Sequence, residues 1–316
     1  MTLENFLMMR HEIMLCLAAV IVLVGEIFVA EDKKKSLIPV ALLAFAAVTI
    51  IGFIPVPVGE LFGGMYRSSI LTYAMKNILN LGVLIVFLQS AAWMKTETFA
   101  DKISEYFILL LSTLIGMNFM ISSGDFLMFY LGLELATIPL AALAAFDKFK
   151  NHSAEAGIKF ILSSALSSGI LLYGISMIYG SAGSIYFAEI ATTFSNTPLQ
   201  VFGLIFFIAG MGFKISLVPF HLWTADVYEG APVTITAYFS VISKGAAAFI
   251  FTILLFTVFR PVSEIWQTIL YVLAVSTMTI GNLFALRQNN IKRFLAFSSI
   301  AQAGFILLGI MGNSQL

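Results

Sequence analysis

Residues 210–221 read Gly-Met-Gly-Phe-Lys-Ile-Ser-Leu-Val-Pro-Phe-His, an apolar segment in which a single charge, Lys214, lies between glycines and a proline. The uncharged run before it, Ile190 to Phe213, exceeds the roughly 20 residues that a helix needs to cross a bilayer. Pro219 has no backbone donor and clashes with the preceding turn, so it predicts a broken helix near Lys214–Pro219. Inside a membrane, irregular backbone persists only when it is buried in protein or lines a wet cavity. The segment therefore predicts a helical bundle built around this break.

The whole chain has the composition of a multi-spanning membrane protein. Of its 316 residues, 60% are hydrophobic and 11% are charged, whereas charged residues make up about a quarter of a soluble domain. The formal net charge is zero, which excludes a nucleic-acid partner because no basic face can neutralise phosphates. We therefore expect an all-α, polytopic transmembrane bundle in contact with the lipid bilayer, with no sizeable soluble domain.

About ten membrane spans are predicted from the apolar runs. Their approximate ranges are 13–30, 36–55, 70–94, 105–123, 125–146, 156–180, 198–222, 233–259, 264–286 and 291–312. The first span has a charged flank and no small-residue cleavage site, and a second span follows at once. We interpret it as a retained helix rather than a signal peptide.

The basic residues predict the orientation of these spans, because cytoplasmic loops hold an excess of Lys and Arg. The odd-numbered loops and their flanks carry eleven: Lys33, Lys34, Lys35, Lys95, Lys102, Lys148, Lys150, Lys159, Arg287, Lys292 and Arg293. The opposite side carries three: Arg10, Arg67 and Arg260. This asymmetry predicts that the N-terminus lies outside and the odd-numbered loops lie in the cytoplasm.

Glu134 is the most deeply placed carboxylate. It lies nine residues into a helix that opens at Asp125, which corresponds to a depth of roughly 14 Å, near the midplane. Its neighbours in sequence are apolar, so desolvation favours the protonated form unless a cation lies close. An ionisable group at this depth indicates a functional site by default. The two candidate roles are a proton relay or ion pair, and a protonated acid that serves only helix packing.

Lys214 and Lys244 are the corresponding basic candidates. Lys244 lies about eleven residues into its span, and desolvation lets a buried lysine gain and lose a proton near neutral pH. Lys214 lies at the predicted break, and interrupted helices near the midplane mark ion sites in many transporters. His221 follows the break, and an imidazole titrates close to physiological pH. The alternatives are snorkelling or structural ion pairs for the lysines and a simple hydrogen-bonding role for His221.

Four further charges are assigned to the edges of the spans. Lys76 lies some six residues inside its span, where snorkelling to the outer interface explains it as well as a buried role does. Glu26 is expected at the inner interface. Asp226 and Glu229 are expected to shape a cytoplasmic connection after the break, although they could also line a path for protons.

Several kinds of site are missing from the sequence. The single Cys16 provides neither a disulfide nor a set of ligands for an iron–sulfur cluster or metal. There is no Gly-x-Gly-x-x-Gly motif that opens a helix after a strand and no Walker loop. We therefore expect no cofactor and no metal in this chain, and energy supplied by an ion gradient or by a partner protein.

Three stretches together resemble the antiporter-like, proton-translocating membrane subunits of respiratory complex I, which are homologous to Mrp-type sodium/proton antiporter subunits. The first runs from Gly212 to Trp223 and continues through Tyr228-Glu229-Gly230-Ala231-Pro232 to Ser243-Lys244; the others are Asn290–Ile300 and Gly132–Leu135. The predicted outside N-terminus, the short first loops and Gly230-Ala231-Pro232 favour the smaller member of this group over its larger relatives.

The resemblance implies a fold, a role and a set of partners. The fold would be two inverted five-helix repeats, giving N-terminal helices over 1–104, a first repeat over 105–260 and the start of a second over 261–316. The chain would belong to a multi-subunit NADH:quinone oxidoreductase of the bacterial inner membrane, beside neighbouring membrane-arm subunits. FMN, iron–sulfur clusters, NADH and quinone would reside in partner subunits, which drive electron transport.

The resemblance also implies a proton path. Glu134 would pair with Lys214, and Lys244 would pass the proton toward the second repeat. Two departures stand out. The chain ends at Asn313–Leu316 after ten spans where about fourteen are expected, so we expect a truncated sequence. Gln302 stands where many relatives carry a histidine, and glutamine cannot titrate. The main alternative is an Mrp-type sodium/proton antiporter subunit, and a third possibility is a purely structural spacer of the membrane arm.

Overall fold

A computed structural model of the chain describes residues 7–55, 57–96, 99 and 101–312. Residues 1–6, which begin the first predicted unit, and Asn313–Leu316, on which the expected truncation rests, lie outside the described residues. The prediction of a helical transmembrane bundle is confirmed. One short antiparallel sheet interrupts it, where β1 (Gly59–Leu61) pairs with β2 (Tyr66–Ser68).

The α-helices are α2 (Arg10–Phe28), α3 (Leu37–Gly52), α4 (Ile70–Met94), α5 (Ile103–Ile121), α6 (Phe126–Ala144), α7 (Asn151–Ala182), α8 (Phe187–Thr193), α9 (Pro198–Ile215), α10 (Leu222–Gly230), α11 (Val233–Ala237), α12 (Lys244–Thr257), α13 (Ser263–Leu286) and α14 (Ile291–Gly312). Shorter helical segments are η1 (Glu31–Ser36), η2 (Phe62–Gly64), η4 (Tyr238–Ser243) and η5 (Arg260–Val262). Of these, η4 is a π-helix between α11 and α12.

In the described part of the chain, ten helices are long and apolar enough to cross a membrane, as the sequence predicts. Two boundaries differ from the expected ones. The sixth span, α7, extends over Asn151–Ala182, because its polar first turn continues the helix beyond the apolar run and Gly183 ends it in the left-handed region. The seventh, α9, ends at Ile215 rather than near residue 222.

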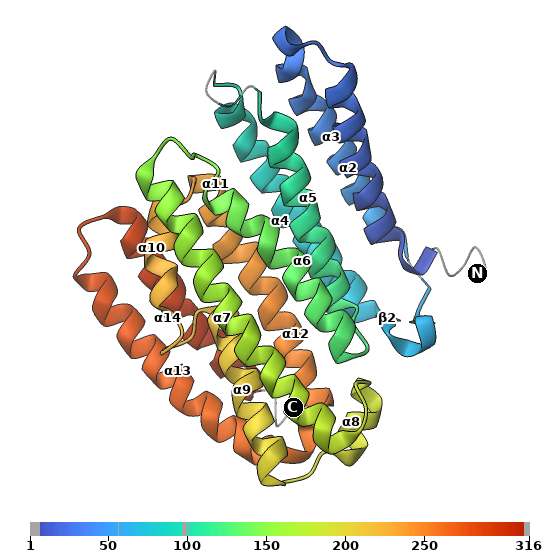
Figure 1. Cartoon of the computed structure of the whole chain (residues 1–316), viewed down its shortest axis with the longest axis vertical. Coiled ribbons are helices and arrows are strands. Elements are labelled where there is room, and N and C mark those ends of the chain that lie inside the picture. Colours follow the sequence, from blue (N-terminus) through green and yellow to red (C-terminus); the bar gives the residue numbers. More distant parts are fainter. Residues whose placement is uncertain (1–6, 56, 97–98, 100, 313–316) are drawn as a thin grey trace.

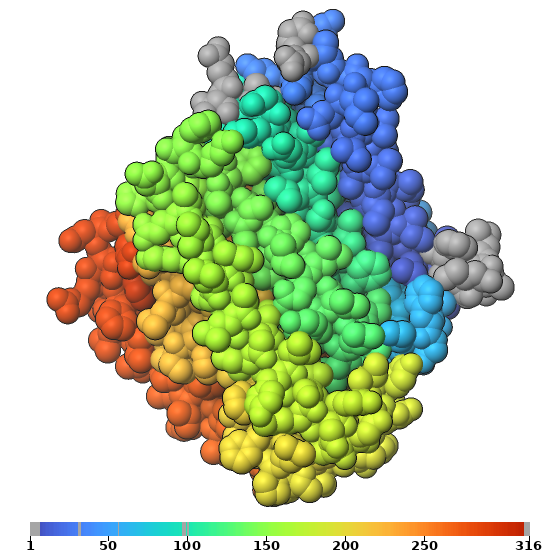
Figure 2. All heavy atoms as spheres, in the orientation of Figure 1, coloured from blue at the N-terminus to red at the C-terminus, as the bar shows by residue number. Residues whose placement is uncertain are grey.

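The helices form a slab that runs from the N-terminal hairpin to the C-terminal one (Figure 1). The hairpin of α2 and α3 lies at one edge, and α13 and α14 lie at the opposite edge. Between them, α5 and α6 pack together, and α7 packs against both α6 and α9. Figure 2 shows that the green segments α6 and α7 cover much of one face. The broken helix α9 therefore packs against α7 and α12, while one side of it is exposed.

Two glycines bring α5 and α6 into close contact in the turn of α6 that carries Glu134. A Cβ atom on Gly132 would lie 2.5 Å from the backbone N of Met120, and one on Gly116 would lie 2.3 Å from the backbone N of Ala136. Real Cβ atoms do not approach that closely, so glycine is required for the two backbones to meet. Small residues of this kind are typical of helix contacts in membranes, where packing rather than the hydrophobic effect drives association.

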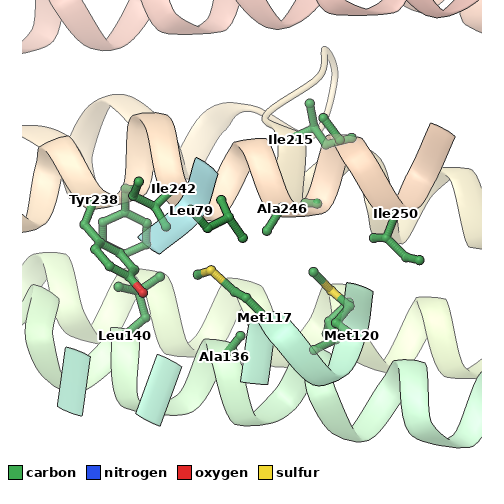
Figure 3. Close-up of a cluster of buried hydrophobic side chains, with 14 of the residues drawn as sticks. Leu79, Met117, Met120, Ala136, Leu140, Ile215, Tyr238, Ile242, Ala246 and Ile250 are labelled. Atoms are coloured by element: carbon green, nitrogen blue, oxygen red, sulfur yellow. The ribbon is translucent and has the colours of Figure 1, made fainter. Parts of the chain in front are cut away.

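One face of α12 and the preceding π-helix is apolar, and it determines where Lys244 points. Tyr238, Ile242 and Ala246 follow each other at intervals of four residues on the side of this span that packs against α4 and α5, where Leu79 of α4 and Met117 of α5 lie beside Ala246 (Figure 3). Lys244 lies two residues from Ile242, which places it on the opposite side of the helix. The apolar face therefore directs the lysine away from α5 and toward the C-terminal helices.

Candidate proton-transfer site

The predicted break in the seventh span lies directly after Lys214. The helix closes with bonds from the backbone N of Leu217 to the Gly212 carbonyl (2.7 Å) and from that of Ser216 to the Phe213 carbonyl (3.0 Å). These two bonds form a Schellman ending, whose left-handed position is usually glycine. Here it is Ser216, with φ of 68°. A non-glycine residue in this region is strained, and such residues cluster at functional sites.

The chain beyond the break is fixed by side chains from both directions. Thr277 of α13 accepts a hydrogen bond from the backbone N of Val218 at 3.0 Å. The indole of Trp223, at the start of α10, donates to the carbonyl of Phe213 at 3.1 Å. Both bonds satisfy backbone groups that a continuous helix would have paired internally. Specific side-chain hydrogen bonds thus stabilise the break and fix the position of the end of α9.

Lys214 lies in the last turn of α9 and reaches toward α6. Its Nζ donates to Oγ1 of Thr137 at 2.7 Å. Thr137 lies one helical turn beyond Glu134, so both side chains belong to the same part of α6. The ammonium group is therefore held by a neutral hydroxyl, with a carboxylate one turn away.

The expected pairing of Glu134 with Lys214 is not a direct one. Among the described residues, no ion pair joins the two side chains, and Oε1 of Glu134 is buried without a hydrogen-bond partner. The lysine bonds to the Thr137 hydroxyl instead, and that hydroxyl itself donates to the Leu133 carbonyl at 2.6 Å. An unpartnered buried carboxylate oxygen is costly. Such a group in a native structure requires an explanation, which supports a functional rather than a packing role for Glu134.

Lys244 lies opposite the apolar face of its span and is 4% exposed. Its Nζ donates to Oγ of Ser299 on α14 at 2.9 Å and lies 5.3 Å from the centre of the Tyr228 ring. The lysine therefore has a hydroxyl and an aromatic face as neighbours, with no ion pair in the described part of the chain. The contact with α14 joins the lysine to the hairpin that the sequence assigns to the second repeat.

The structure separates the other two polar candidates from the lysines. His221 is buried at the start of α10, but among the described residues it makes no hydrogen bond to Lys214 or Lys244. The side chain of Gln302 is exposed on α14. Of the four predicted relay residues, the structure thus places Lys214 against Thr137, one helical turn from Glu134 on α6, and connects Lys244 to α14.

Asp226 and Glu229 form a polar clamp at the end of α10. Asp226 accepts from Lys159 of α7 at 2.6 Å and from Arg293 of α14 at 2.8 Å, and the same arginine bonds to Glu229 at 2.8 Å. Burial alone would raise the pKa of Asp226, but the hydrogen bonds from Lys159 and Arg293 outweigh it and lower that pKa below its usual value. The expected connection is thus a charged joint between α7, α10 and α14.

A cavity of about 410 Å³ opens beside this clamp. Its lining includes His152, Glu229 and Lys292, with Thr234 on its inner side. Thr234 bonds to the hydroxyl of Tyr106 at 3.0 Å, and Tyr106 bonds to Ser90 at 2.7 Å. The cavity therefore lies beside the charged groups that join α10 to α14, with a chain of hydroxyl groups on α4 and α5 next to one of its lining residues.

Sequence analysis missed one buried charge pair, at the other end of the bundle. Lys76 was left open between snorkelling and burial, and Glu12 was not considered. In the structure Lys76 is 3% exposed and its Nζ lies 2.5 Å from Oε1 of Glu12. Glu12 lies near the start of the first span, where a carboxylate is also explained by the interface. No sequence signal identified it, because its partner lies on another helix.

The comparisons with known proteins agree with this arrangement. Residues 123–316, more than half of the chain, match the family model described as NADH:quinone oxidoreductase/Mrp antiporter, TM. The chain belongs to this family. The match includes the break, Lys214, Lys244 and the clamp. It confirms the family resemblance that the sequence motifs indicated.

Curated relatives are similar over nearly the whole chain. It is 52% identical over 314 residues to the NADH-quinone oxidoreductase subunit N of Phocaeicola vulgatus, and 39% identical over 317 residues to that of Desulforamulus reducens. The matches cover 99% and 98% of the chain, and 66% of each relative. The chain thus spans just under two thirds of the length of these relatives. Their name agrees with the smaller complex I member that the sequence favoured.

Solved structures share the fold. A chain of respiratory complex I from Thermus thermophilus with bound aureothin matches with a TM-score of 0.76 and 28% identity, covering 96% of this chain and 65% of that one. A chain of an archaeal membrane-bound sulfane sulfur reductase matches with a TM-score of 0.79 and 26% identity, covering 97% and 64%. A chain of the Mrp complex from Dietzia, 23% identical, shares the fold with a TM-score of 0.77, over 98% and 59%.

Proposed function

We propose that this chain is part of a proton-translocating membrane-arm subunit of a bacterial NADH:quinone oxidoreductase. The observation that carries the proposal is Lys214 at the end of a broken membrane helix, beside Glu134 and held by a neutral hydroxyl. Ionisable groups at broken helices mark ion sites in transporters. The similarity to subunit N of NADH-quinone oxidoreductases supports this assignment.

In this proposal Lys214 is a proton carrier whose affinity for its proton depends on Glu134. When Glu134 is negatively charged and close, it stabilises the charged lysine, and when it is protonated or moves away, that stabilisation is lost. Thr137 keeps the ammonium group in reach while leaving the carboxylate free to change its charge. Redox-linked movement in partner subunits would then release the proton from Lys214 without a redox group in this chain.

In this proposal Lys244 is the next proton carrier, and His221, at the start of α10, is a shuttle between carriers. The contact of Lys244 with Ser299 points the lysine toward α14, in the direction of the proposed second repeat. The units proposed from the sequence, 1–104, 105–260 and 261–316, are consistent with α13 and α14 packing together at one edge (Figure 1). The cavity beside Glu229 would admit protons from the cytoplasm.

The partners follow from the same family likeness. The chain would lie in the bacterial inner membrane with its N-terminus outside, beside neighbouring antiporter-like and small membrane subunits. FMN, iron–sulfur clusters, NADH and quinone would be held by other subunits. In the described residues, no group of three or more His, Cys, Asp or Glu side chains could hold a metal ion.

The proposal is tested in membrane vesicles that contain the whole enzyme with the full-length subunit. Proton transport during NADH oxidation is compared between wild type, Lys214→Met and Lys244→Met, with assembly measured in each. We expect assembled enzyme that loses proton transport in both variants. Lys244→Arg should also fail, because arginine does not release its proton. Normal transport in both methionine variants would show that the lysines are structural and favour a spacer role.

Sodium/proton exchange is the second candidate, because the family description includes Mrp antiporters. Glu134 and Lys214 could take part in such an exchange with the same geometry. Sodium uptake that depends on Lys214 and continues without NADH would favour it. Proton transport that needs NADH oxidation and is unchanged by sodium would support the oxidoreductase assignment.

A further inference from the structure

A closed triangle of polar groups lies at the outer ends of α2 and α4. Nζ of Lys76 lies 2.5 Å from Oε1 of Glu12 and donates to the hydroxyl of Tyr66 at 3.0 Å. The Tyr66 hydroxyl in turn lies 3.1 Å from Oε2 of Glu12. All three side chains are at most 3% exposed. A carboxylate and an ammonium group are therefore fully withdrawn from lipid and water at this site.

Packing alone does not require such a pair. Desolvation of two charges offsets most of their attraction, and apolar residues of similar volume often stabilise a protein as well or better. Ionisable groups inside membrane spans are therefore expected to have a function. The site also contains more polar groups than the ion pair needs.

The additional polar groups converge on Gly52 at the end of α3. A Cβ atom at Gly52 would lie 2.6 Å from Oδ1 of Asn77, 3.5 Å from Nε2 of His11 and 3.6 Å from Nδ2 of Asn80. His11 and Asn77 bond to each other at 3.2 Å. Both amide atoms of Asn80 are buried without a hydrogen-bond partner. Two to four polar partners are what a buried water molecule requires.

A second unpartnered amide, Asn118 of α5, lies at a depth similar to that of Asn80. The bond between Ser90 of α4 and Tyr106 of α5 sets the register of the two antiparallel helices. Asn80 lies ten residues before Ser90 on α4, and Asn118 lies twelve residues after Tyr106 on α5. Because the two helices run in opposite directions, both counts lead toward the same side of the bundle, so the two amides lie at similar depth. Both amide atoms of Asn118 are also buried without a partner. Buried amides of this kind thus lie on both α4 and α5.

We propose that Glu12, Lys76 and Tyr66 form a second proton-holding site, which exchanges protons through water bound beside Gly52. A proton moves from Nζ of Lys76 to Oε1 of Glu12, so that one N–H bond breaks, one O–H bond forms and both groups become neutral. Glu12 then releases its proton to water and Lys76 takes one from water. The charged and titratable groups that surround the site are Arg10, His11, Cys16 and Tyr73.

The first test removes both charges together. In the assembled full-length enzyme, Glu12→Gln/Lys76→Met leaves no unpaired charge, so a purely structural pair tolerates it. We expect normal assembly and NADH oxidation with loss of most of the proton transport per NADH. Wild-type transport in this double variant would overturn the proposal.

The second test displaces the polar groups packed around Gly52 without changing any charge. Gly52→Ala places a methyl group against Asn77, whereas Gly180→Ala on α7 meets no atom within 4 Å and serves as the matched control. We expect lower proton transport per NADH in Gly52→Ala and wild-type transport in Gly180→Ala. If the double variant fails to assemble, the comparison of Gly52→Ala with Gly180→Ala tests the proposal instead. Equal proton transport in these two glycine variants would then overturn the proposal.

The readout rests on the proposed proton transport, so Lys214→Met is measured in parallel. Loss of transport in Lys214→Met with normal transport in the Glu12 and Gly52 variants would refute only the second site. Normal transport in Lys214→Met with loss of transport in the Glu12 and Gly52 variants would support the second site and refute the role of Lys214. Infrared spectroscopy adds a readout independent of transport, because a protonated Glu12 gives a carboxylic acid band that shifts in heavy water and is missing in Glu12→Gln.

Discussion

Glu12 and Lys76 are in direct contact, whereas Glu134 and Lys214 are not. The first pair has a nitrogen–oxygen distance of 2.5 Å and is almost fully buried. In the second, the lysine bonds to Thr137 at 2.7 Å and both charged residues are partly exposed. A direct pair leaves a buried charge behind when one partner is removed, and its short contact lets a proton pass between the two groups. Where no bond joins the lysine to the carboxylate, each group can be replaced without breaking an ion pair. The same two residue types therefore differ in how strongly each depends on the other.

The largest expected difference between the two sites is in stability. Glu12→Gln leaves Lys76 buried without a counter-charge and should lower the free energy of unfolding by about 3–5 kcal/mol. Glu134→Gln should change it by less than about 1 kcal/mol, because no ion pair is lost, and should impair proton transport instead. Denaturant unfolding of the purified full-length subunit measures both. Equal losses of stability would show that the two sites do not differ in this way.

Replacement of the Thr137 hydroxyl, which accepts from Lys214, sharpens the comparison. Thr137→Val preserves shape but removes the acceptor of Lys214, which should cost about 1–3 kcal/mol. Proton transport should fall while assembly is retained, and Thr137→Ser should restore it. The measurement is transport per NADH in vesicles. Unchanged transport in Thr137→Val would mean that the hydroxyl does not position the lysine.

A smaller effect is expected at Lys244. Ser299→Ala removes one neutral hydrogen bond but leaves the backbone carbonyl of Ser299 and the Tyr228 ring as neighbours. The unfolding free energy should fall by about 1 kcal/mol. Thermal unfolding measures it, with Ser276→Ala on the exposed side of α13 as a control. A loss as large as that of Glu12→Gln would indicate that Ser299 is the main support of the lysine.

The smallest effect should come from the clamp at the end of α10. Arg293 and Asp226 are each about 32% exposed, and solvent-exposed ion pairs contribute about 0–1 kcal/mol. Arg293→Gln should therefore lower stability slightly, and the difference from wild type should shrink in high salt. Unfolding at two salt concentrations measures this. A large loss that salt does not change would show that the clamp is a buried structural element.

The depth and type of the candidate residues were predictable, but their partners were not. The positions of Glu134, Lys214 and Lys244 follow from counting along apolar runs, since each residue rises about 1.5 Å along a helix. Thr137 and Ser299 were missed because a hydroxyl in a membrane span carries no signal of its own. Lys76 lies near a span end, where snorkelling and burial give the same sequence pattern.

By itself the sequence determined the class of protein, the ten spans, the break near Pro219 and the family. Each of these depends on local properties, such as hydropathy over about 20 residues or the missing donor of a proline. Only the tertiary structure decided which groups meet. Glu12 is 64 residues from Lys76, Thr137 is 77 from Lys214 and Ser299 is 55 from Lys244. Contacts over such separations depend on how the helices pack, and hydropathy along the chain does not encode that packing.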